Sequence, residues 1–391
     1  MRVLHVISAF VPVGGGPTSA LRGMVRAVRA QGVDAEVATT DSLIRSTALV
    51  PLDARVEQHG VPVRYFHCPW LRKYGVSRDF ARWIDAGVRD FDVLHIHGVF
   101  NHSTLAAARA ARRRGVPYVL RTAGELDPRP MRKNHVLKTL FLRTLARPAL
   151  AAAAAVHVTS RAEASGARPR CANRPMVVIP LATDPPGAVE PRQREEFLGQ
   201  HPALRDAKVI LFLSRLDPIK GFDVLLPALV RLRQEPIPWR LLLAGSGAPR
   251  FEQRLRRAIV RSGLEALVTF AGFLGPEGVR AALSVADVSV LPSHHENFGM
   301  AVVEAMAARV PVVISDQVGI HEEIAAHEAG VVTRLDAGEL ATALGRVLGD
   351  EALRRKLADN AEALVAAEFR WPKVAGQLIE LYSRLGRNGR G

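Results

Sequence analysis

The stretch HENFGMAVVEAM, residues 295–306, carries the strongest structural signal in the chain. It follows a hydrophobic segment, residues 287–292, that is expected to form a strand, and Gly299 allows a sharp turn into a new helix. The first N–H groups of that helix lack intrahelical partners, and together with the helix dipole they suit a phosphate. Glu296 and Glu304 flank the turn, and their carboxylates can accept hydrogen bonds from hydroxyl groups. The stretch therefore suits a nucleotide-sugar, which carries both a diphosphate and hydroxyls.

A second motif precedes this stretch in the chain. It is SRLDPIKG, residues 214–221, and it lies between an apolar strand expected at residues 209–213 and a helix that begins at Phe222. Arg215 and Lys220 are therefore placed in a loop at the carboxyl end of a strand, where ligands bind in open α/β sheets. A guanidinium can form paired hydrogen bonds with phosphate oxygens, and an ammonium adds a point charge. Alone, the two cations are equally consistent with ordinary surface charges; together with residues 295–306 they predict a diphosphate site.

The rest of the chain alternates strands and helices. In the first half, strands are expected at residues 3–8, 33–39, 61–66, 92–97, 115–120 and 154–160. Such alternation is typical of βαβ units and a parallel sheet, and the second half repeats the pattern. We therefore predict two α/β domains, residues 1–184 and 185–368, followed by a helical tail, residues 369–391.

These motifs resemble those of the GT4 glycosyltransferases, a retaining family with the GT-B fold. That family carries a Glu-x7-Glu motif and a Gly/Ser-Arg-Leu-x3-Lys-Gly motif at a similar separation, and the likeness is most specific over residues 205–335. The resemblance implies two Rossmann-like parallel-sheet domains that face each other across a cleft. It also implies that the first domain binds the acceptor, that the second binds the nucleotide-sugar donor, and that the tail helix crosses back onto the first domain.

The resemblance further implies roles for the motif residues. Arg215 and Lys220 are expected to bind the donor diphosphate and to neutralise charge on the departing nucleotide. Glu304 is expected to accept the ribose hydroxyls, Glu296 to contact the transferred sugar, and residues 272–274 to line the base pocket. The full set of donor-site candidates is Gly15, Gly16, Arg215, Lys220, Gly245, Gly272, Phe273, Leu274, Glu296, Asn297, Phe298, Gly299, Met300, Ala301 and Glu304.

Candidates in the first half of the chain are less specific. Glycines at residues 14–16 follow the first strand without the Gly-x-Gly-x-x-Gly spacing of a dinucleotide site, and the resemblance places Gly15 and Gly16 near the donor phosphates and the reacting sugar. His97 ends a strand and is the candidate for the histidine with which many relatives face the reacting sugar. A hydrogen-bonded histidine at a strand end explains His97 equally well.

The catalytic candidates implied by the resemblance are His97, Arg215, Lys220 and Glu296. In the commonly argued route of this family, the acceptor hydroxyl enters on the side of the leaving phosphate, and the enzyme positions the reactants and stabilises the diphosphate. No Asp-x-Asp motif ends a suitable strand, so we expect no essential metal and no cofactor beyond the nucleotide-sugar substrate. The loop after the strand at 115–120 supplies three candidate acceptor contacts: Arg121, Glu125 and Asp127.

The net charge of +15 over 391 residues has three explanations: nucleic acid as a partner, an anionic membrane surface that carries a lipid-linked acceptor, or a general arginine bias. The sequence lacks zinc-finger and RNA-recognition signatures, so we do not predict nucleic acid as a partner. Residues 131–150 form a basic amphipathic pattern. This pattern fits a surface helix packed on its own sheet, and it equally fits docking on a membrane or an acidic acceptor. The chain has no apolar run of the roughly 18 residues that span a bilayer, and we expect a cytoplasmic location with peripheral attachment to the inner membrane face.

We therefore predict a retaining, metal-independent transferase that moves a hexose from a UDP- or GDP-sugar to a glycan or lipid-linked acceptor in the synthesis of a surface polysaccharide. Two enzymatic alternatives stay open, a transferase that acts on a small soluble acceptor and a nucleotide-sugar epimerase with the same fold. A third alternative is a non-catalytic subunit that kept the fold.

Overall fold

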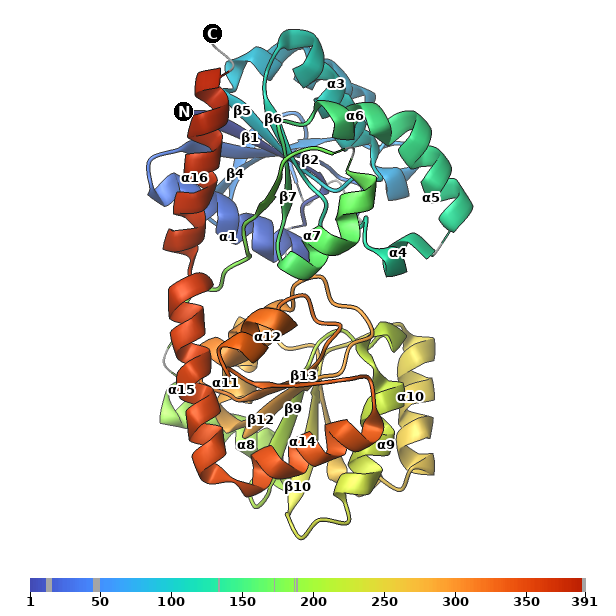
Figure 1. Cartoon of the computed structure of the whole chain (residues 1–391), viewed down its shortest axis with the longest axis vertical. Coiled ribbons are helices and arrows are strands. Elements are labelled where there is room, and N and C mark those ends of the chain that lie inside the picture. The colour runs from blue at the N-terminus through green and yellow to red at the C-terminus, as the bar shows by residue number, and fades with distance from the viewer. Residues whose placement is uncertain are drawn as a thin grey trace. The chain divides into compact units, whose positions relative to one another are not determined.

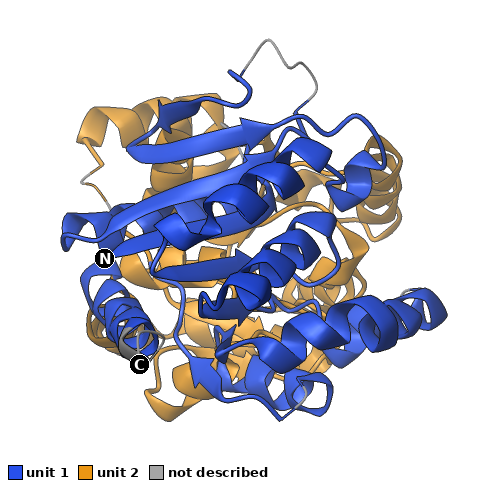
Figure 2. Cartoon of the chain, turned by 90° about the horizontal axis from the view of Figure 1, so that it is seen from above, with its two compact units in different colours: residues 1–182, 371–391 blue, residues 183–370 orange. Residues whose placement is uncertain are grey.

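The computed structural model describes residues 1–11, 16–44, 50–132, 134–171, 173–185, 187 and 189–388. The chain forms two compact units, which Figure 2 shows in different colours. Unit 1 comprises residues 1–182 together with 371–391, and unit 2 comprises residues 183–370. The boundaries expected at 184/185 and 368/369 each lie two residues away from these divisions.

Unit 1 is built on a sheet that has eight strands in the described part of the chain, in the order β3-β4-β2-β1-β5-β6-β7-β8. Neighbouring strands are parallel except β3 and β4. The strands are β1 (Arg2–Ala9), β2 (Asp34–Thr40), β3 (Arg55–Gln58), β4 (Val61–Phe66), β5 (Val93–His97), β6 (Tyr118–Arg121), β7 (Ala155–Val158) and β8 (Met176–Val178). The strand order reverses between β1 and β5, and ligands of open parallel sheets bind beyond the carboxyl ends of the strands at such a switch point.

Helices cover both faces of this sheet, because each face exposes apolar side chains that must be buried (Figure 1). On one face, strand residues such as Leu4 and Ile96 share a core with helices α2 (Arg78–Gly87), α3 (His102–Arg114), α6 (Arg147–Ala152) and α7 (Arg161–Ala167). The other face carries α1 (Gly16–Ala30) and α16 (Trp371–Asn388). Trp371 packs so closely on α1 that a Cβ on Gly23 would lie 2.2 Å from its ring. The C-terminal helix is therefore an integral part of unit 1.

Unit 2 is built on a sheet whose six described strands are all parallel, in the order β11-β10-β9-β12-β13-β14. The strands are β9 (Lys208–Leu213), β10 (Trp239–Ala244), β11 (Val268–Gly272), β12 (Val288–Leu291), β13 (Val312–Ser315) and β14 (Val331–Thr333). The helices are α8 (Pro191–Gln200), α9 (Phe222–Leu232), α10 (Pro249–Arg261), α11 (Pro276–Val285), α12 (Met300–Ala307), α13 (His321–Ala326), α14 (Ala337–Gly349) and α15 (Glu351–Glu368). Here the strand order reverses between β9 and β12, which places the switch point between the two motifs found in the sequence.

The basic amphipathic region of unit 1 is not one continuous helix. It consists of α4 (Pro128–Arg132), α5 (His135–Phe141), a π-helical turn (Leu142–Ala146) and α6. Within the described residues, no helix has both the length and the apolar character that a membrane crossing requires.

Candidate active site

The loops after β9 and β12 are held together by their backbones. Gly221 has a φ of 79°, and a Cβ there would lie 1.8 Å from the carbonyl oxygen of Pro292. Only glycine tolerates both that conformation and that approach. In addition, the His294 N–H donates to the Ile219 carbonyl at 2.8 Å. The two predicted motifs therefore meet in one surface at the carboxyl edge of the unit 2 sheet.

Lys220 and Glu296 form an ion pair across this junction. The Lys220 ammonium donates to the Glu296 carboxylate, and the two side chains are only 9% and 22% exposed. The backbone of Glu296 is fixed on both sides, because its N–H donates to the Gln317 carbonyl at 3.1 Å and its carbonyl accepts from the Gly319 N–H at 2.8 Å. A charged pair with this little exposure is held in a defined geometry, which a ligand with matching charges can use.

Arg215 lies in the same loop as Lys220 and is exposed. Among the described residues, none pairs with its guanidinium, so this cation is available to a ligand. Helix α12 begins directly after Gly299, whose φ is 97°, and the turn is anchored by Phe298, which is buried edge-on against Phe369 at 5.6 Å between ring centroids. The first helical bonds run from the Val302 and Val303 N–H groups to the Gly299 carbonyl at 2.9 and 3.1 Å, so the N–H groups of Met300 and Ala301 precede them and have no acceptor inside the helix.

Glu304 lies just over one turn into α12. Burial raises the pKa of its carboxyl group to about 7, and no partner for this carboxylate is found within the described part of the chain. A half-buried carboxyl group without a partner can accept hydrogen bonds from ligand hydroxyls, and such bonds favour its ionised form. The placement fits the expectation that Glu304 contacts a ribose, which stays a prediction.

The loops after β10 and β11 extend the same edge. The Gly245 N–H donates to the Gly272 carbonyl at 2.7 Å, and the Leu216 N–H donates to the Ser246 carbonyl at 2.9 Å. Phe273 directly follows Gly272 in the chain, and the Phe273 side chain is 72% exposed. An exposed aromatic ring at the end of a strand can stack on a planar base. The donor-site candidates of unit 2 therefore lie in the loops after four neighbouring strands.

In unit 1, His97 ends β5 beside the switch point and is 3% exposed. Its Nε2 lies 3.1 Å from Nδ1 of His5, and its ring stacks on that of His95 with centroids 4.3 Å apart. Burial, together with His5 and Arg121, holds the pKa of His97 well below its usual range. The imidazole is therefore neutral at pH 7. It can exchange hydrogen bonds with a substrate, but it cannot supply positive charge.

The three acceptor candidates lie at the end of β6 and in the loop that follows. Arg121 is 5% exposed, pairs in register with His97, and has the pKa of its guanidinium lowered by burial. Glu125 accepts from the N–H groups of Val99 at 2.6 Å and Phe100 at 3.2 Å, so its carboxylate holds the loop that follows His97. Burial raises the pKa of Glu125, while these hydrogen bonds oppose the shift.

Asp127, the third acceptor candidate, is 7% exposed. Burial and the neighbouring Glu163 raise the pKa of Asp127 to about 7. Of the glycines expected to approach the donor, Gly15 lies outside the described residues. Gly16 is the first residue of α1 and so belongs to a helix, whereas the glycines here were expected to form a loop. This helix N-terminus follows β1 at the switch point of unit 1.

Two family profiles match the chain, one in each unit. Residues 15–182 match the family described as "Glycosyl transferase 4-like domain", and residues 193–364 match "Glycosyl transferases group 1". The chain belongs to the GT4-type glycosyltransferases. The predicted enzyme class, a glycosyltransferase, is confirmed by these matches and by the relatives that follow.

Curated relatives of this glycosyltransferase include the alpha-D-kanosaminyltransferase of Streptomyces kanamyceticus, 30% identical over 207 residues, a match that spans 53% of each chain. The GDP-mannose:cellobiosyl-diphosphopolyprenol alpha-mannosyltransferase of Xanthomonas oryzae pv. oryzae is 28% identical over 98% of this chain and 96% of that protein. Among solved structures, Anabaena HepE in complex with UDP and glucose aligns with a TM-score of 0.79 at 23% identity, covering 98% of this chain and 100% of that one. The predicted GT-B fold is thereby confirmed.

Glu163 holds two loops of unit 1 of the glycosyltransferase together, and this role was not predicted from the sequence. Its buried carboxylate accepts from the Thr122 hydroxyl and the Gly124 N–H, both at 2.6 Å, and from the N–H and hydroxyl of Thr159 at 2.7 and 2.8 Å. It thus joins the loop after β6 to the end of β7. The available signal was Ser160-x-x-Glu163, a capping pattern that marks the start of α7, where the Ser160 hydroxyl accepts from the Glu163 N–H at 3.1 Å.

A group of buried histidines was also missed, apart from His97. One nitrogen from each of His5, His95 and His97 lies within 4.8 Å of the others, a spacing that a metal ion could use. However, these rings already bond to one another or to neighbours, and the guanidinium of Arg121 depresses the pKa of each of them by its charge. A nearby positive charge opposes a dication, so we assign this group to hydrogen bonding.

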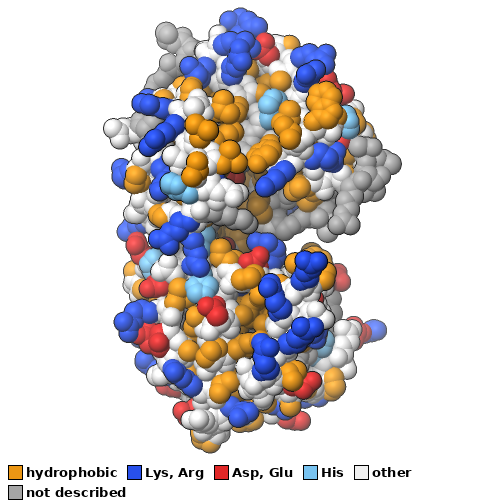
Figure 3. Space-filling model, turned by 90° about the vertical axis from the view of Figure 1, so that its right-hand side faces the viewer, with side chains coloured by type: hydrophobic (Ala, Val, Ile, Leu, Met, Phe, Trp, Pro, Cys, Tyr) orange, Lys and Arg blue, Asp and Glu red, His pale blue; other side chains and the backbone are white. Residues whose placement is uncertain are grey.

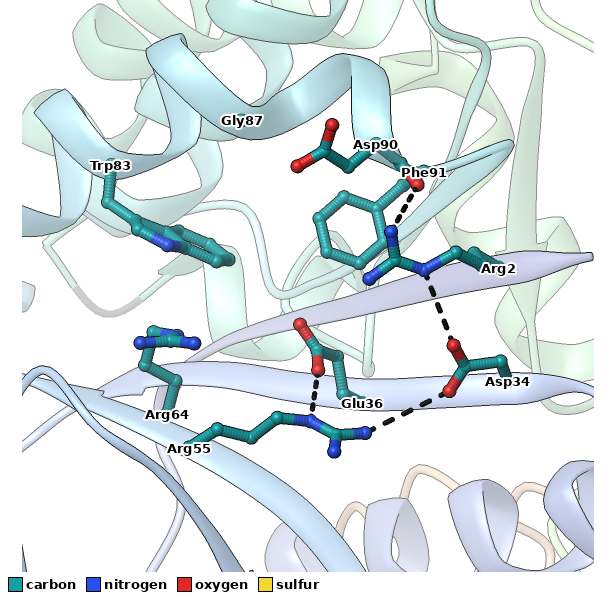
Figure 4. A pocket seen from close by; sticks show the side chains of 9 residues that line it. All are labelled: Arg2, Asp34, Glu36, Arg55, Arg64, Trp83, Gly87, Asp90 and Phe91. Atoms are coloured by element: carbon teal, nitrogen blue, oxygen red, sulfur yellow. Dashed lines mark hydrogen bonds and ion pairs between the residues drawn. The ribbon is translucent and has the colours of Figure 1, made fainter.

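A separate pocket of the glycosyltransferase lies at the opposite edge of the unit 1 sheet (Figure 4). Its lining residues are Arg2, Asp34, Glu36, Arg55, Arg64, Trp83, Gly87, Asp90 and Phe91. Arg2 and Asp34 are the first residues of the parallel strands β1 and β2, so this pocket is at the amino ends of these strands. Its charges neutralise one another, with Asp34 paired to Arg2 at 3.3 Å and Glu36 to Arg55 at 2.6 Å. We assign it a structural ion-pair network.

Proposed function

We propose that the chain is a retaining hexosyltransferase that moves a hexose from a UDP- or GDP-sugar to a lipid-linked glycan in the synthesis of a surface polysaccharide. The observation that carries the proposal is the Lys220–Glu296 pair at the switch point of unit 2. It places a cation for the diphosphate beside a carboxylate for the sugar hydroxyls. The two donor classes are supported by the Xanthomonas relative, which is named for GDP-mannose, and by Anabaena HepE, whose structure contains UDP and glucose.

In the proposed reaction, the leaving diphosphate is stabilised by charge and by fixed dipoles. Arg215 and Lys220 supply the positive charge, and the orphan N–H groups at the start of α12 supply the dipole. The acceptor hydroxyl forms a bond to the anomeric carbon on the face from which the nucleotide leaves. The bond between that carbon and the phosphate oxygen breaks, and the hydroxyl proton passes to the departing phosphate. No step of this scheme requires a metal.

A thermal-shift screen tests the donor site. The purified protein is heated with UDP, GDP, ADP and their sugars, each with magnesium and with EDTA. A ligand that binds only the folded state raises the unfolding midpoint. We expect a shift with UDP or GDP compounds that EDTA leaves unchanged. The absence of any shift at millimolar nucleotide would contradict the proposal and favour a non-catalytic subunit.

The lipid-linked acceptor is supported by an exposed surface on unit 1, the α5 surface. It is formed by Val136, Leu137, Leu140 and Leu145, which are 80%, 58%, 57% and 54% exposed. These side chains face solvent, so the alternative of an apolar face packed on its own sheet is wrong for them. Figure 3 looks onto the side of the molecule on which α5 lies in Figure 1, and it shows hydrophobic side chains among Lys and Arg.

The charge around the α5 surface fits an anionic membrane. Arg132, Arg143 and Arg147 are exposed, and residues 128–162 contain no acidic residue. Exposed leucines among arginines suit the interface of an anionic bilayer, where each well-placed cation adds about 1 kcal/mol. We therefore propose that this face docks on the cytoplasmic membrane and brings the enzyme to its acceptor.

Vesicle flotation tests this docking. The wild-type protein is expected to float with vesicles of phosphatidylcholine and phosphatidylglycerol, but not with phosphatidylcholine alone. The double variant Leu137→Ser/Leu140→Ser should stay in solution, whereas Val260→Ser, which changes a 53% exposed valine of unit 2, should float normally. Equal flotation of all three proteins, or no flotation of the wild type, would contradict the membrane surface and favour a small soluble acceptor.

A further inference from the structure

A chain of buried hydrogen bonds connects the C-terminal helix to the sheet of unit 1. The Tyr382 hydroxyl lies 2.7 Å from Nδ1 of His95, and Nε2 of His95 lies 3.1 Å from Nδ1 of His157. Nε2 of His157 in turn lies 2.8 Å from the Ile179 carbonyl. The Tyr382, His95 and His157 side chains have no exposed surface. These groups come from α16, β5, β7 and the segment after β8.

The Ile179 carbonyl, at one end of this series of hydrogen bonds, determines which group donates in each of them. A carbonyl only accepts, so Nε2 of His157 carries a proton. Burial and Arg121 lower the pKa of His157 to about 3, so the ring is neutral and its Nδ1 is an acceptor. Nε2 of His95 must therefore donate to His157, and Nδ1 of His95 must accept from the Tyr382 hydroxyl. Each ring is held in a single tautomer.

His97 is held against this chain from two sides. Its ring stacks on His95, with an angle of 29° between the planes, and its Nε2 shares a hydrogen bond with Nδ1 of His5. Within the described residues, Nδ1 of His97 and Nε2 of His5 have no partner. Two neutral rings carry two protons, and one proton lies in the shared bond. The outer nitrogens are therefore one donor and one acceptor in either arrangement.

We propose that Tyr382 is a positioning residue for His97. Through its bond to Nδ1, Tyr382 fixes the orientation of the His95 ring, and the stacked His97 ring is thereby fixed. The buried Nδ1 of His97 has no partner among the described residues, which leaves it to bond to a substrate hydroxyl that enters at the end of β5. This inference rests on the proposed function and on the predicted role of His97 as the histidine that faces the reacting sugar. On this proposal, the C-terminal helix α16, which is far from His97 in sequence, helps to orient the histidine that contacts the sugar.

The test compares Tyr382→Phe with Leu378→Val, which alters a fully buried residue of the same helix and removes no hydrogen-bonding group. Loss of one buried hydrogen bond is expected to lower kcat roughly fivefold to tenfold in Tyr382→Phe, with the donor KM changed less than twofold. Leu378→Val is expected to retain kcat within twofold. In a His97→Ala background, the effect of Tyr382→Phe should shrink to less than twofold, because the group it positions is gone.

Imidazole nitrogen NMR gives a readout that does not depend on activity. In the wild type, His95 and His157 are expected as single Nε2–H tautomers, which the Ile179 carbonyl fixes. Tyr382→Phe should keep these tautomers but shift the Nδ1 resonance of His95, which loses its hydrogen bond, while Leu378→Val should leave that resonance unchanged. The inference is overturned by unchanged kcat in Tyr382→Phe, by equal losses in both variants, or by an Nδ1–H tautomer of His95 in the wild type. If the wild type transfers no sugar, the proposed function fails, and the NMR comparison still decides whether Tyr382 orients these rings.

Discussion

The two units place different chemistry at the same topological position. In both sheets the strand order reverses once, and the candidate residues lie beyond the carboxyl ends of the strands at that point. Unit 2 gathers charges there, with Arg215 exposed and Lys220 paired to Glu296. Unit 1 gathers neutral, buried rings, with His97 stacked on His95. The shared topology supplies a binding edge, and the side chains determine that one edge suits phosphates and the other suits hydroxyls.

Acid should have the largest effect on unit 1, because the four most strongly shifted buried histidines all lie there. Burial holds the pKa of four histidines below 6.5, namely His5, His95, His97 and His157. The unfolded chain binds protons on these groups below pH 6.5 and the folded unit does not. Their contribution is therefore complete above pH 6.5 and is lost as the pH falls toward 3. For the histidines alone, the expected slope is roughly 1.4 kcal/mol per pH unit for each ring, or about 5 kcal/mol together. The carboxyl groups of Asp127 and Glu304, whose pKa values are raised to about 7, contribute with the opposite sign and reduce the net slope.

Urea denaturation at pH 7.5, 6.0 and 5.0 measures this slope. His157→Gln should reduce it by about one proton, while His135→Gln, at an exposed position of α5, should leave it unchanged. A stability that is flat between pH 7.5 and 5.0 would show that the histidines are protonated or accessible in the folded protein.

A substitution at Gly221 should disrupt unit 2 at its junction. In Gly221→Ala, the new methyl group meets the Pro292 carbonyl oxygen, and the positive φ is strained as well. The expected loss is about 2–4 kcal/mol of unfolding free energy. Gly199→Ala is the matched control, since a Cβ there meets nothing within 4 Å and the residue lies in α8. Denaturation should show this control to be neutral or more stable; similar losses in both variants would refute the close approach.

The smallest predicted effect concerns Glu304, at the proposed donor site of unit 2. Burial raises the pKa of Glu304 to about 7, so this group contributes stability that is present below pH 4.5 and is lost as the pH rises through 7. In the proposed site the ribose hydroxyls bond to the ionised carboxylate, so nucleotide-sugar affinity should rise about fivefold from pH 6 to 7 and about tenfold by pH 8, and then level off. Isothermal titration of wild type and Glu304→Gln checks this. A pH dependence that persists in Glu304→Gln would assign it to another group.

Much of the fold and the unit 2 site could be predicted because their signals are local. The predicted two-domain GT-B fold is confirmed, and the strand, turn and helix around residues 287–307 are arranged as expected. The Lys220 and Glu296 motifs are each contiguous, and a short loop fixes where each side chain lies. The predicted roles of these residues in binding the donor stay predictions.

The unit 1 network could not be predicted for the opposite reason. The hydrogen bond between His95 and Tyr382 joins residues that are 287 positions apart in the sequence. No local sequence pattern indicates that α16 packs on β5. The same limit applies to Glu163, which contacts Thr122 across 41 positions. The break in the helical region 128–152 was also missed, since the amphipathic pattern continues through the π-helical turn. Tertiary contacts, rather than local propensity, determine all three features.

The central claim is that the carboxyl edge of unit 2 binds the donor diphosphate. Isothermal titration of the nucleotide-sugar into Lys220→Ala and Lys208→Ala tests it most directly. Lys208 is the first residue of β9 and Lys220 lies in the loop after the carboxyl end of β9, and both pair with a carboxylate, Lys208 with Asp287 at 3.0 Å. We predict that Lys220→Ala raises Kd by roughly 10- to 100-fold, as expected for a charge-assisted hydrogen bond, and that Lys208→Ala changes Kd less than twofold. Wild-type affinity in a folded Lys220→Ala variant would contradict the account.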